Sequence, residues 1–351
     1  MSYSGTVGQT TISVQQLIDH GARRSGKFAE ELTIEQVQSA KESLFYILSN
    51  LINQGVQYFA IKKQVIGLNA NQAQYTLPAG SNDVLNALYR RMQRPTGSPF
   101  ASSGSAALAF DSNTATSVVQ NAINGNIGIN FGTSPVYAGS IGILPAVSGS
   151  FDILLEWSND GTTWTTLYDT GVTTWVSGSW LWYDIDPGVS ASYYRMRETG
   201  GNTLNVSEFY VGNNSTEITM SRLNRDDYTN LPNKNFTSNQ PFQFWFNRTI
   251  PFPTLTLWPV PSDPFVQVTV WYSAYVQDIG ALSGQLAIPD RWYLAIQCML
   301  AHQMSQELPS VDIARIQYLE GQAEKYFQMA EQEERDKSPI YLQPQIGVYT
   351  S

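Results

Sequence analysis

The chain has 351 residues and a formal net charge of −9, with 29 acidic against 20 basic side chains. This length predicts two or three domains. The acidic balance argues against a protein that grips nucleic-acid phosphates, which needs clustered Lys and Arg. Its single cysteine, Cys298, excludes an intramolecular disulfide framework. No apolar run approaches membrane-spanning length and the first residues lack a signal-peptide pattern, so we expect no membrane contact.

Charged residues make up only 14% of the chain and aromatic residues 12%, including 9 Trp and 19 Tyr. Aromatic side chains are common in buried cores and at subunit contacts, whereas charged side chains dominate free surfaces. We therefore expect many surfaces that are buried or covered by other subunits.

Two helices are predicted near the N-terminus. The first covers residues 13–24, with an apolar side formed by Val14, Leu17 and Ile18. The second begins at Thr33 and lies within residues 33–59. There Thr33 and Gln36 have capping-box spacing, in which each side chain pairs with the other residue's backbone N–H. Apolar residues recur at helical spacing, and additional ones widen the apolar face: Phe45, Ile47 and Ile52. This helix therefore needs partners on more than one side.

Strand patterns follow at residues 57–68, 74–77 and 84–92. The composition then changes at residue 95. Residues 95–213 contain 2 basic residues, Arg195 and Arg197, against 9 acidic residues, and no lysine. Their Gly, Ser, Thr and Asn content and their short strand patterns predict an all-β sandwich inserted into the surrounding domain. Because both ends lie in Pro-, Gly- or Asn-rich connectors, we expect this insert to fold by itself and to be dispensable for assembly of the rest.

The surrounding pattern resumes after residue 213. Strands are predicted at residues 217–222, 242–246, 255–258 and from 266 onward, where apolar and polar residues alternate. A helix then starts near Pro289 and ends before Pro309. Ser310 is the expected cap of a last helix that reaches about residue 335.

No catalytic centre is expected. The chain has two histidines, His20 and His302, and neither has Cys, Asp or Glu at metal-ligand spacing, so packed or interfacial histidines are favoured. Cys298 is expected to be a small core residue. The pairs Asp184/Asp186 and Asp226/Asp227 could serve acid–base or metal chemistry, but turns and helix starts use Asp in the same way. We therefore expect a protein that is not an enzyme.

The parts on either side of the insert resemble the head-to-tail adaptor of short-tailed phages, also called the tail accessory or packaged-DNA-stabilisation factor. The resemblance rests on the capped helix at Thr33, the strand and turn at residues 255–261, the strand that follows, and the helix start at residues 286–292 that leads into residues 300–307. This resemblance depends on the order and spacing of these segments, since no single motif among them is very specific.

The resemblance implies a structural virion protein of the head–tail neck, made in the host cytoplasm. Its copies would form a ring, a homo-dodecamer in that family, between the portal protein and the tail nozzle or hub protein. Packaged DNA would pass through without specific binding, because an acidic lumen does not hold a polyanion.

The insert resembles a discoidin-like, galactose-binding jelly roll. Three stretches carry this resemblance: residues 109–116 like the family's early loop, residues 155–164 like its SxDGxxW turn, and residues 193–197 with 206–211 like its closing strands. The resemblance implies a structural calcium at Asp111, Thr116 and Glu208, whose oxygen ligands suit that ion. At Val118 the family usually has Trp, which puts the loop's conformation, and so the metal, in doubt; no other cofactor is expected.

The tryptophans of the insert are candidate ligand or docking residues: Trp164, Trp175, Trp180 and Trp182. They could stack on sugar rings, but cores and interfaces use Trp in the same way. Docking, for example of a tail fibre or tailspike, is favoured over glycan binding. The alternatives to an adaptor are a carbohydrate-binding tail protein that contacts the host surface and a polysaccharide hydrolase.

The last residues, 338–351, follow a helix stop at Ser338-Pro339 and contain no charged side chain. A solvated tail would be polar or charged. We therefore expect an extended portal-docking tail that uses Ile340, Tyr341, Leu342, Pro344, Ile346, Val348 and Tyr349.

Together these patterns predict an α+β fold. It consists of a discontinuous helical bundle plus a small antiparallel β-region over residues 1–94 and 214–337, an inserted all-β jelly-roll sandwich over residues 95–213, and the tail over residues 338–351.

Overall fold

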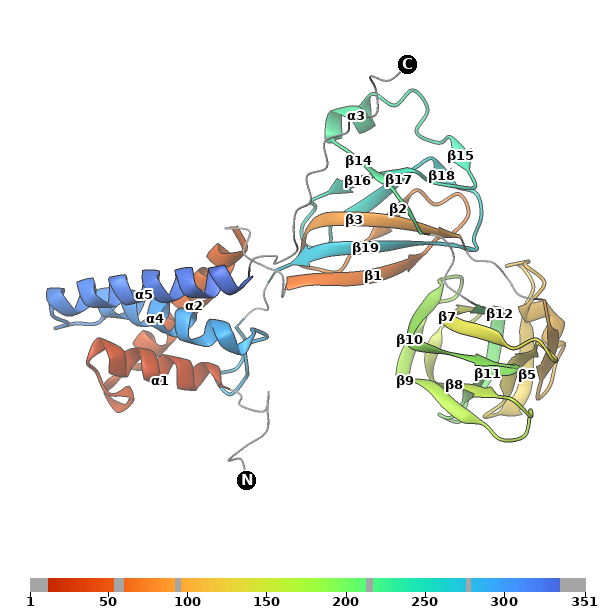
Figure 1. Ribbon diagram of the computed structural model, residues 1–351, viewed down its shortest axis with the longest axis horizontal. Helices are drawn as coiled ribbons and strands as arrows, with labels where there is room; N and C mark the ends of the chain where they lie inside the picture. The colour runs from red at the N-terminus through yellow and green to blue at the C-terminus, as the bar shows by residue number, and fades with distance from the viewer. Residues whose placement is uncertain (1–11, 54–59, 92–95, 213–216, 276–278, 335–351) are drawn as a thin grey trace, which may run out of the picture. The chain divides into compact units, whose positions relative to one another are not determined.

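The computed structural model describes residues 12–53, 60–91, 96–212, 217–275 and 279–334 (Figure 1). The chain divides into two compact units. The helical unit is formed by both ends of the chain, Met1–Ile61 and Ala274–Ser351, and the β unit is Lys62–Ser273. Within the β unit we call residues 96–212 the insert and the remainder the β-region. Insert and β-region fall in one compact unit, so the sequence boundaries at residues 95 and 213 stay predictions.

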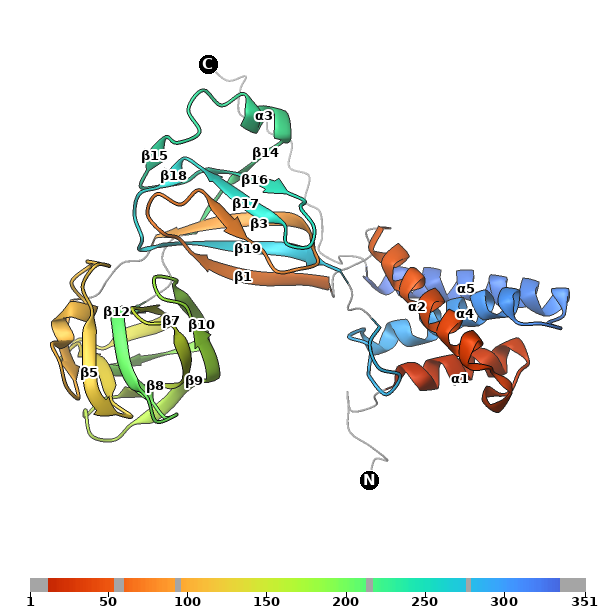
Figure 2. The same cartoon turned by 180° about the vertical axis from the view of Figure 1, so that it is seen from behind.

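The helical unit contains α1 (Val14–Ser25), α2 (Ile34–Asn53), α4 (Asp290–Glu307) and α5 (Ile313–Glu334), with a 3-10 turn at Ala29–Glu31. Helix α4 contacts each of the other three helices (Figures 1 and 2). Its buried residues accordingly lie around much of its circumference and include Trp292, Ala295, Ile296, Leu300 and Met304. The core of the unit therefore joins residues that are more than 230 positions apart in the chain.

The predicted helix starts are confirmed for α1 and α2. The Gln36 N–H donates to Thr33 Oγ1 at 3.2 Å and the Thr33 N–H donates to Gln36 Oε1 at 3.0 Å. Ser13 and Gln16 form the same box before α1. The wide apolar face expected of α2 is only partly correct. Ile47 is buried, but Phe45 is 39% exposed, so the core takes a narrower stripe than the sequence indicated.

The cap expected for α5 is wrong. Ser310 has a φ of 63°, a left-handed conformation that is not that of a helix cap. The helix begins three residues later, and its first bonds run from the N–H groups of Arg315 and Ile316 to the Asp312 carbonyl. Asp312 Oδ1 also accepts a long bond, 3.4 Å, from the Ala314 N–H.

The β-region contains two four-stranded sheets. One has the order β1-β19-β3-β13 and the other β14-β16-β17-β2. Their bounds are β1 (Ile61–Gly67), β2 (Gln74–Thr76), β3 (Ser81–Arg91), β13 (Glu217–Thr219), β14 (Ser221–Leu223), β16 (Gln243–Asn247), β17 (Thr254–Trp258) and β19 (Val266–Ala274). Short strands β15 (Thr237–Ser238) and β18 (Val260–Pro261) form a further pair, and α3 (Arg225–Thr229) follows β14.

The expectation of an antiparallel β-region is wrong at two places. Strand β14 pairs in parallel with β16, and β15 pairs in parallel with β18. Both parallel pairs join segments that are separated by other structure, so no hairpin forces the antiparallel direction on them. The remaining strand pairs set out here, β13–β3, β16–β17 and β17–β2, are antiparallel.

The insert is the predicted all-β sandwich. Its sheets have the orders β10-β7-β12-β5 and β4-β6-β11-β8-β9. The strands are β4 (Ser98–Ala101), β5 (Val118–Ile123), β6 (Asn126–Asn130), β7 (Val136–Pro145), β8 (Gly149–Ser158), β9 (Thr165–Trp175), β10 (Leu181–Ala191), β11 (Tyr193–Glu198) and β12 (Thr203–Gly212), with a 3-10 turn η3 (Ala106–Ala109). Sequence-distant strands are neighbours throughout, as in Greek-key sandwiches. One core lies between the sheets and includes Ile127, Ile143, Leu155, Met196 and Phe209.

The packing of α4 can be tested by matched truncations on that helix. Leu300 is 0% exposed and Leu294 is 41% exposed. We expect Leu300→Ala to lower the free energy of unfolding of the helical unit by about 2–5 kcal/mol, through lost burial and a residual cavity. Leu294→Ala should change it by less than about 1 kcal/mol. Urea unfolding followed by far-ultraviolet circular dichroism measures both; equal losses would contradict the central position of α4.

Candidate functional site

Trp175 is not on a surface. It is 1% exposed and stacks on Phe151 inside the sandwich, with the ring centroids 4.2 Å apart. The expectation that it belongs to a ligand or docking surface is therefore corrected. Trp175 ends β9, an edge strand with many exposed residues, and no local pattern indicates that its last residue turns inward.

Trp180 and Trp182 lie against the β-region. Their rings stack with centroids 4.8 Å apart, and Trp180 makes an edge contact with Phe265 at 5.8 Å. Gly67 of β1 provides the space, because a Cβ there would clash with both tryptophans. These two residues therefore dock the insert onto its own chain, and we call their contact surface the joint: Gly67, Trp180, Trp182, Asp184 and Phe265.

Asp184 forms the charged part of the joint. Its carboxylate lies 2.6 Å from Lys63 Nζ and 3.0 Å from Arg90 Nη1. The Arg90 side chain is only 4% exposed and also contacts Glu217, at 2.6 Å from Nε to Oε1. Asp184 of the first aspartate pair is therefore committed to ion pairs that attach the insert to the β-region. In the second pair, Asp227 lies in the first turn of α3 and its N–H bonds Asn224 Oδ1 at 2.7 Å, as expected of a helix start.

Trp164 belongs to a cluster on the outer face of the five-stranded sheet. The Arg195 guanidinium carbon lies 3.9 Å from the Trp164 ring centroid, and Phe100 and Tyr193 approach the ring at 6.1 and 6.5 Å. We call these four residues the Trp164 cluster. Phe100 lies over Gly128, where a Cβ would collide with the Phe100 ring. Arg195 covers one face of the indole, a cation–π contact that holds the ring in place.

Glu156 anchors the cluster electrostatically. Its carboxylate accepts hydrogen bonds from Arg195 Nε at 2.7 Å and from Arg197 Nη2 at 2.9 Å. Burial by itself would raise the pKa of Glu156. The hydrogen bonds and charges of Arg197 and Arg195 outweigh burial and hold that pKa below its usual value. The only two basic residues of the insert are thus committed to one nearly buried carboxylate.

The turn before Trp164 adopts the conformation expected from its motif. Asp160 Oδ1 accepts hydrogen bonds from the N–H groups of Thr163 at 2.7 Å and Thr162 at 2.8 Å, and from Ser158 Oγ at 2.9 Å. These bonds lower the pKa of Asp160. Gly161 has a φ of +73°, which favours glycine. The motif is therefore a structural turn that positions Trp164.

The residues implied as calcium ligands lie on neighbouring elements. Thr116 Oγ1 donates to Asp111 Oδ2 at 2.8 Å, so both belong to one loop after η3. Glu208 is 0% exposed on β12, and its neighbour Phe209 contacts Phe110 of that loop at 5.9 Å. All three donors are oxygens, which suits calcium. The donor types suit the ion, but adjacent residues of a strand point to opposite faces, so the contact of Phe209 with the loop does not bring the Glu208 carboxylate to it. The calcium site stays a prediction. Val118, at the position of the family's Trp, is fully buried in the core.

Other candidate residues have plain structural positions. Cys298 is buried, and burial raises the pKa of its thiol although Arg24 Nη1 lies 3.0 Å from Sγ. The ring of His302 on α4 contacts Gln306 at 3.1 Å. Within the described ranges, no group of three or more His, Cys, Asp or Glu could hold a metal, and no helix is long and apolar enough to span a membrane. The portal-docking residues at 340–349 lie outside the described residues.

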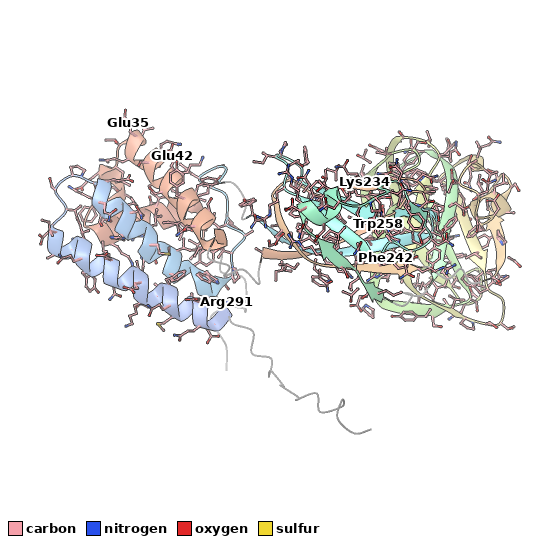
Figure 3. All side chains as sticks on the ribbon, turned by 90° about the horizontal axis from the view of Figure 1, so that it is seen from above. Glu35, Glu42, Lys234, Phe242, Trp258 and Arg291 are labelled. Atoms are coloured by element: carbon pink, nitrogen blue, oxygen red, sulfur yellow. The ribbon has the colours of Figure 1, made fainter. Side chains whose placement is uncertain are left out.

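An aromatic surface that the sequence did not indicate lies on the β-region. Trp258 contacts Phe242 at 5.3 Å and Phe236 at 6.2 Å between ring centroids (Figure 3). Phe236 is 50% and Phe242 is 45% exposed. The three residues come from different segments, so only the folded chain brings them together.

No protein-family model and no curated protein matches the chain. Solved structures match about a third of the chain. A chitosan-binding module of a chitosanase/glucanase from Paenibacillus sp. IK-5 is 24% identical, with 35% of this chain and 98% of that one covered and a TM-score of 0.30. A family 32 carbohydrate-binding module of C. perfringens NanJ, in complex with galactose, is 19% identical with the same coverage and a TM-score of 0.29. An F5/8 type C domain from Bacteroides fragilis is 15% identical over 36% and 98%, with a TM-score of 0.31.

These TM-scores are too low to carry an argument. The assignment of the insert as a two-sheet β-sandwich rests instead on its strand order, its register and its single core. These define the class of the insert as an antiparallel sandwich of the jelly-roll type.

The pairing of Glu156 with two arginines predicts a pH dependence. Folding lowers the pKa of Glu156. Its contribution to the stability of the fold is therefore present at pH values above its pKa in the unfolded chain, and is lost as pH falls through its pKa in the folded chain. We expect Glu156→Gln to destabilise the insert at neutral pH by about 1–3 kcal/mol. The variant should also lose less stability than the parent when pH falls to about 3.

Calorimetry at the two pH values measures this. Asp169→Asn, on exposed strand β9 of the same insert, is the control and should leave the pH dependence nearly unchanged. If the stability of Glu156→Gln depended on pH in the same way as that of the parent, the Glu156 carboxylate would not contribute to the pH dependence.

Proposed function

We propose that the chain is a non-enzymatic structural protein of a virion, a head-to-tail adaptor that forms a ring between portal and tail nozzle. The observation that carries the proposal is the nesting of the chain. Its two ends build one helical unit around α4, and the β unit is inserted between them. This is the organisation implied by the sequence resemblance over the parts outside the insert.

Surface composition supports a subunit of a larger assembly. Large apolar side chains on the helical unit are strongly exposed in the single chain: Ile34 at 89%, Ile313 at 70%, and Tyr46 and Tyr318 at 65% each. Single exposed apolar residues are ordinary, but several on one small unit are typical of surfaces that a partner covers. In a ring, adjacent copies and the portal would cover them, and the acidic net charge would let DNA pass without adhering.

The test is assembly with the portal protein of the same virus. We expect native mass spectrometry to show a closed ring of this chain on the portal, with twelve copies as the adaptor family implies. Removal of residues 338–351 should abolish attachment while leaving the melting temperature of the isolated protein nearly unchanged, because the tail gains its contacts only on the portal. An untruncated chain that stays monomeric beside the portal would overturn the proposal, whereas normal attachment of the truncated chain would overturn only the tail's role.

The second candidate function is carbohydrate binding by the insert. The observation that favours it is the Trp164 cluster, in which partly exposed aromatic rings lie beside guanidinium N–H donors on one sheet face. Sugars are held by aromatic stacking together with charged hydrogen-bond donors. The matched sandwiches from Paenibacillus and C. perfringens are described as chitosan-binding and as a galactose complex.

A glycan array probed with the full chain tests this candidate. We expect one class of glycan to bind, with at least about a tenfold weaker dissociation constant in Trp164→Ala, since each stacked ring contributes on the order of 1–2 kcal/mol. Tyr168→Ala, which removes a 42% exposed ring on β9, should bind normally. An array without any bound glycan, or equal binding by both variants, would reject the candidate.

A further inference from the structure

The insert meets the β-region through the outer face of one of its sheets. Along β10 and its neighbours the register pairs Trp182 with Gly142 and Asp184 with Ser140. Residues that are directly paired across strands share one face of a sheet. Because Asp184 contacts Lys63 and Arg90, Ser140 lies on the same face, toward the β-region. Ser140 is 0% exposed.

Strand β19, next to β1 in the same sheet, is buried on both faces over its first five residues. On β19, Val266, Val268 and Val270 alternate with Gln267 and Thr269, and all five are 0% exposed. Alternation places the two polar residues on the face opposite the valines. The Leu68 N–H donates to the Val266 carbonyl, which places Gly67 beside the start of β19. Gly67 is where Trp180 and Trp182 pack, so Gln267 is adjacent to the joint.

Polar atoms of the joint face and of the adjacent strand β19 lack hydrogen-bond partners among the described residues. They are the indole Nε1 atoms of Trp180 and Trp182, Ser140 Oγ, both amide atoms of Gln267 and Thr269 Oγ1, none of which has a partner within the described residues. Buried polar groups in native proteins are nearly always paired, with protein or with ordered water. These six atoms therefore need ordered water as their partner.

We propose that the joint is hydrated and opens, so that the insert is a hinged arm that Asp184 latches to the β-region. In the closed position two tryptophans are packed over Gly67, and water bridges the polar groups between the sheets. In the open position bulk water satisfies those groups. Apolar packing and the latch favour closure, while the polar groups and the freedom of the arm favour opening.

The charges at the joint make the latch releasable. Asp184 faces two cations, Lys63 and Arg90, and Glu217 is the other acidic group at Arg90. When the insert moves away and the Asp184 ion pairs break, Arg90 still forms its ion pair with Glu217, because these two residues are paired across β3 and β13 within the β-region. Lys63 is 35% exposed and can return to solvent. Opening therefore leaves no buried charge without a partner at this position.

Thiol labelling of the full chain tests the proposal. In a Cys298→Ser background, Ser140→Cys places a thiol in the joint, and Ala138→Cys places one in the sandwich core on the same strand, where residue 138 is also 0% exposed. We expect the S140C variant to be labelled at least about tenfold faster than the A138C variant, because the joint opens without unfolding of the sandwich. Raising NaCl from about 0.1 M to about 1 M, which shortens the Debye length from about 10 Å to about 3 Å, should accelerate the S140C reaction only.

Asp184→Asn, added to Ser140→Cys, should speed labelling at low salt about fivefold and remove most of the salt dependence. Lys63→Gln, at a partly exposed position, gives a second release of the latch if the first variant folds poorly. Labelling of the S140C variant no faster than that of the A138C variant would overturn the hinge. Salt-independent labelling that neither latch variant changes would overturn the role of Asp184.

Discussion

The contact of α4 with α1 and α2 is the constraint on which the rest of the structure depends. It joins the last part of the chain to the first, so everything between must leave the helical unit and return to it. The chain meets this requirement by leaving along β1 and returning along β19, which are neighbours in one sheet. A strand pair therefore closes the long excursion, and its hydrogen bonds offset part of the loop-closure entropy.

The insert is joined to the β-region in the same way, through a pair of neighbouring strands. The insert leaves after β3 and returns at β13, and these strands pair with Arg90 opposite Glu217. Each inserted element thus begins and ends at adjacent positions of the element that carries it, as tolerated domain insertions do. This geometry lets a sandwich with its own core be carried by the β-region without disrupting either sheet.

The joint shows that adjacent ends do not make the insert a free module. Packing of two indoles and the Asp184 latch attach it, but each unpaired buried polar group costs about 1–3 kcal/mol unless water bridges it. The expectation from sequence that the insert is dispensable assumed that only its two connectors join it to the β-region. The contacts imply instead that its deletion would expose Gly67 and the Arg90 environment, so any effect of deletion on assembly would include a change in the β-region itself.

Local patterns in the sequence determined much of this protein. The apolar side of α1, the capping box at Thr33, the alternation along β19 and the composition change near residue 95 indicated helices, strands and an inserted sandwich, because each depends on residues close together in the chain. Tertiary structure alone decided the roles of the tryptophans. Trp175 turned inward, Trp180 and Trp182 docked on Gly67, and Trp164 was covered by Arg195. The same type of side chain can lie in the core, in the joint or on the surface. Which position each tryptophan takes depends on packing against residues far away in the chain, and the local spacing of residues does not encode that packing.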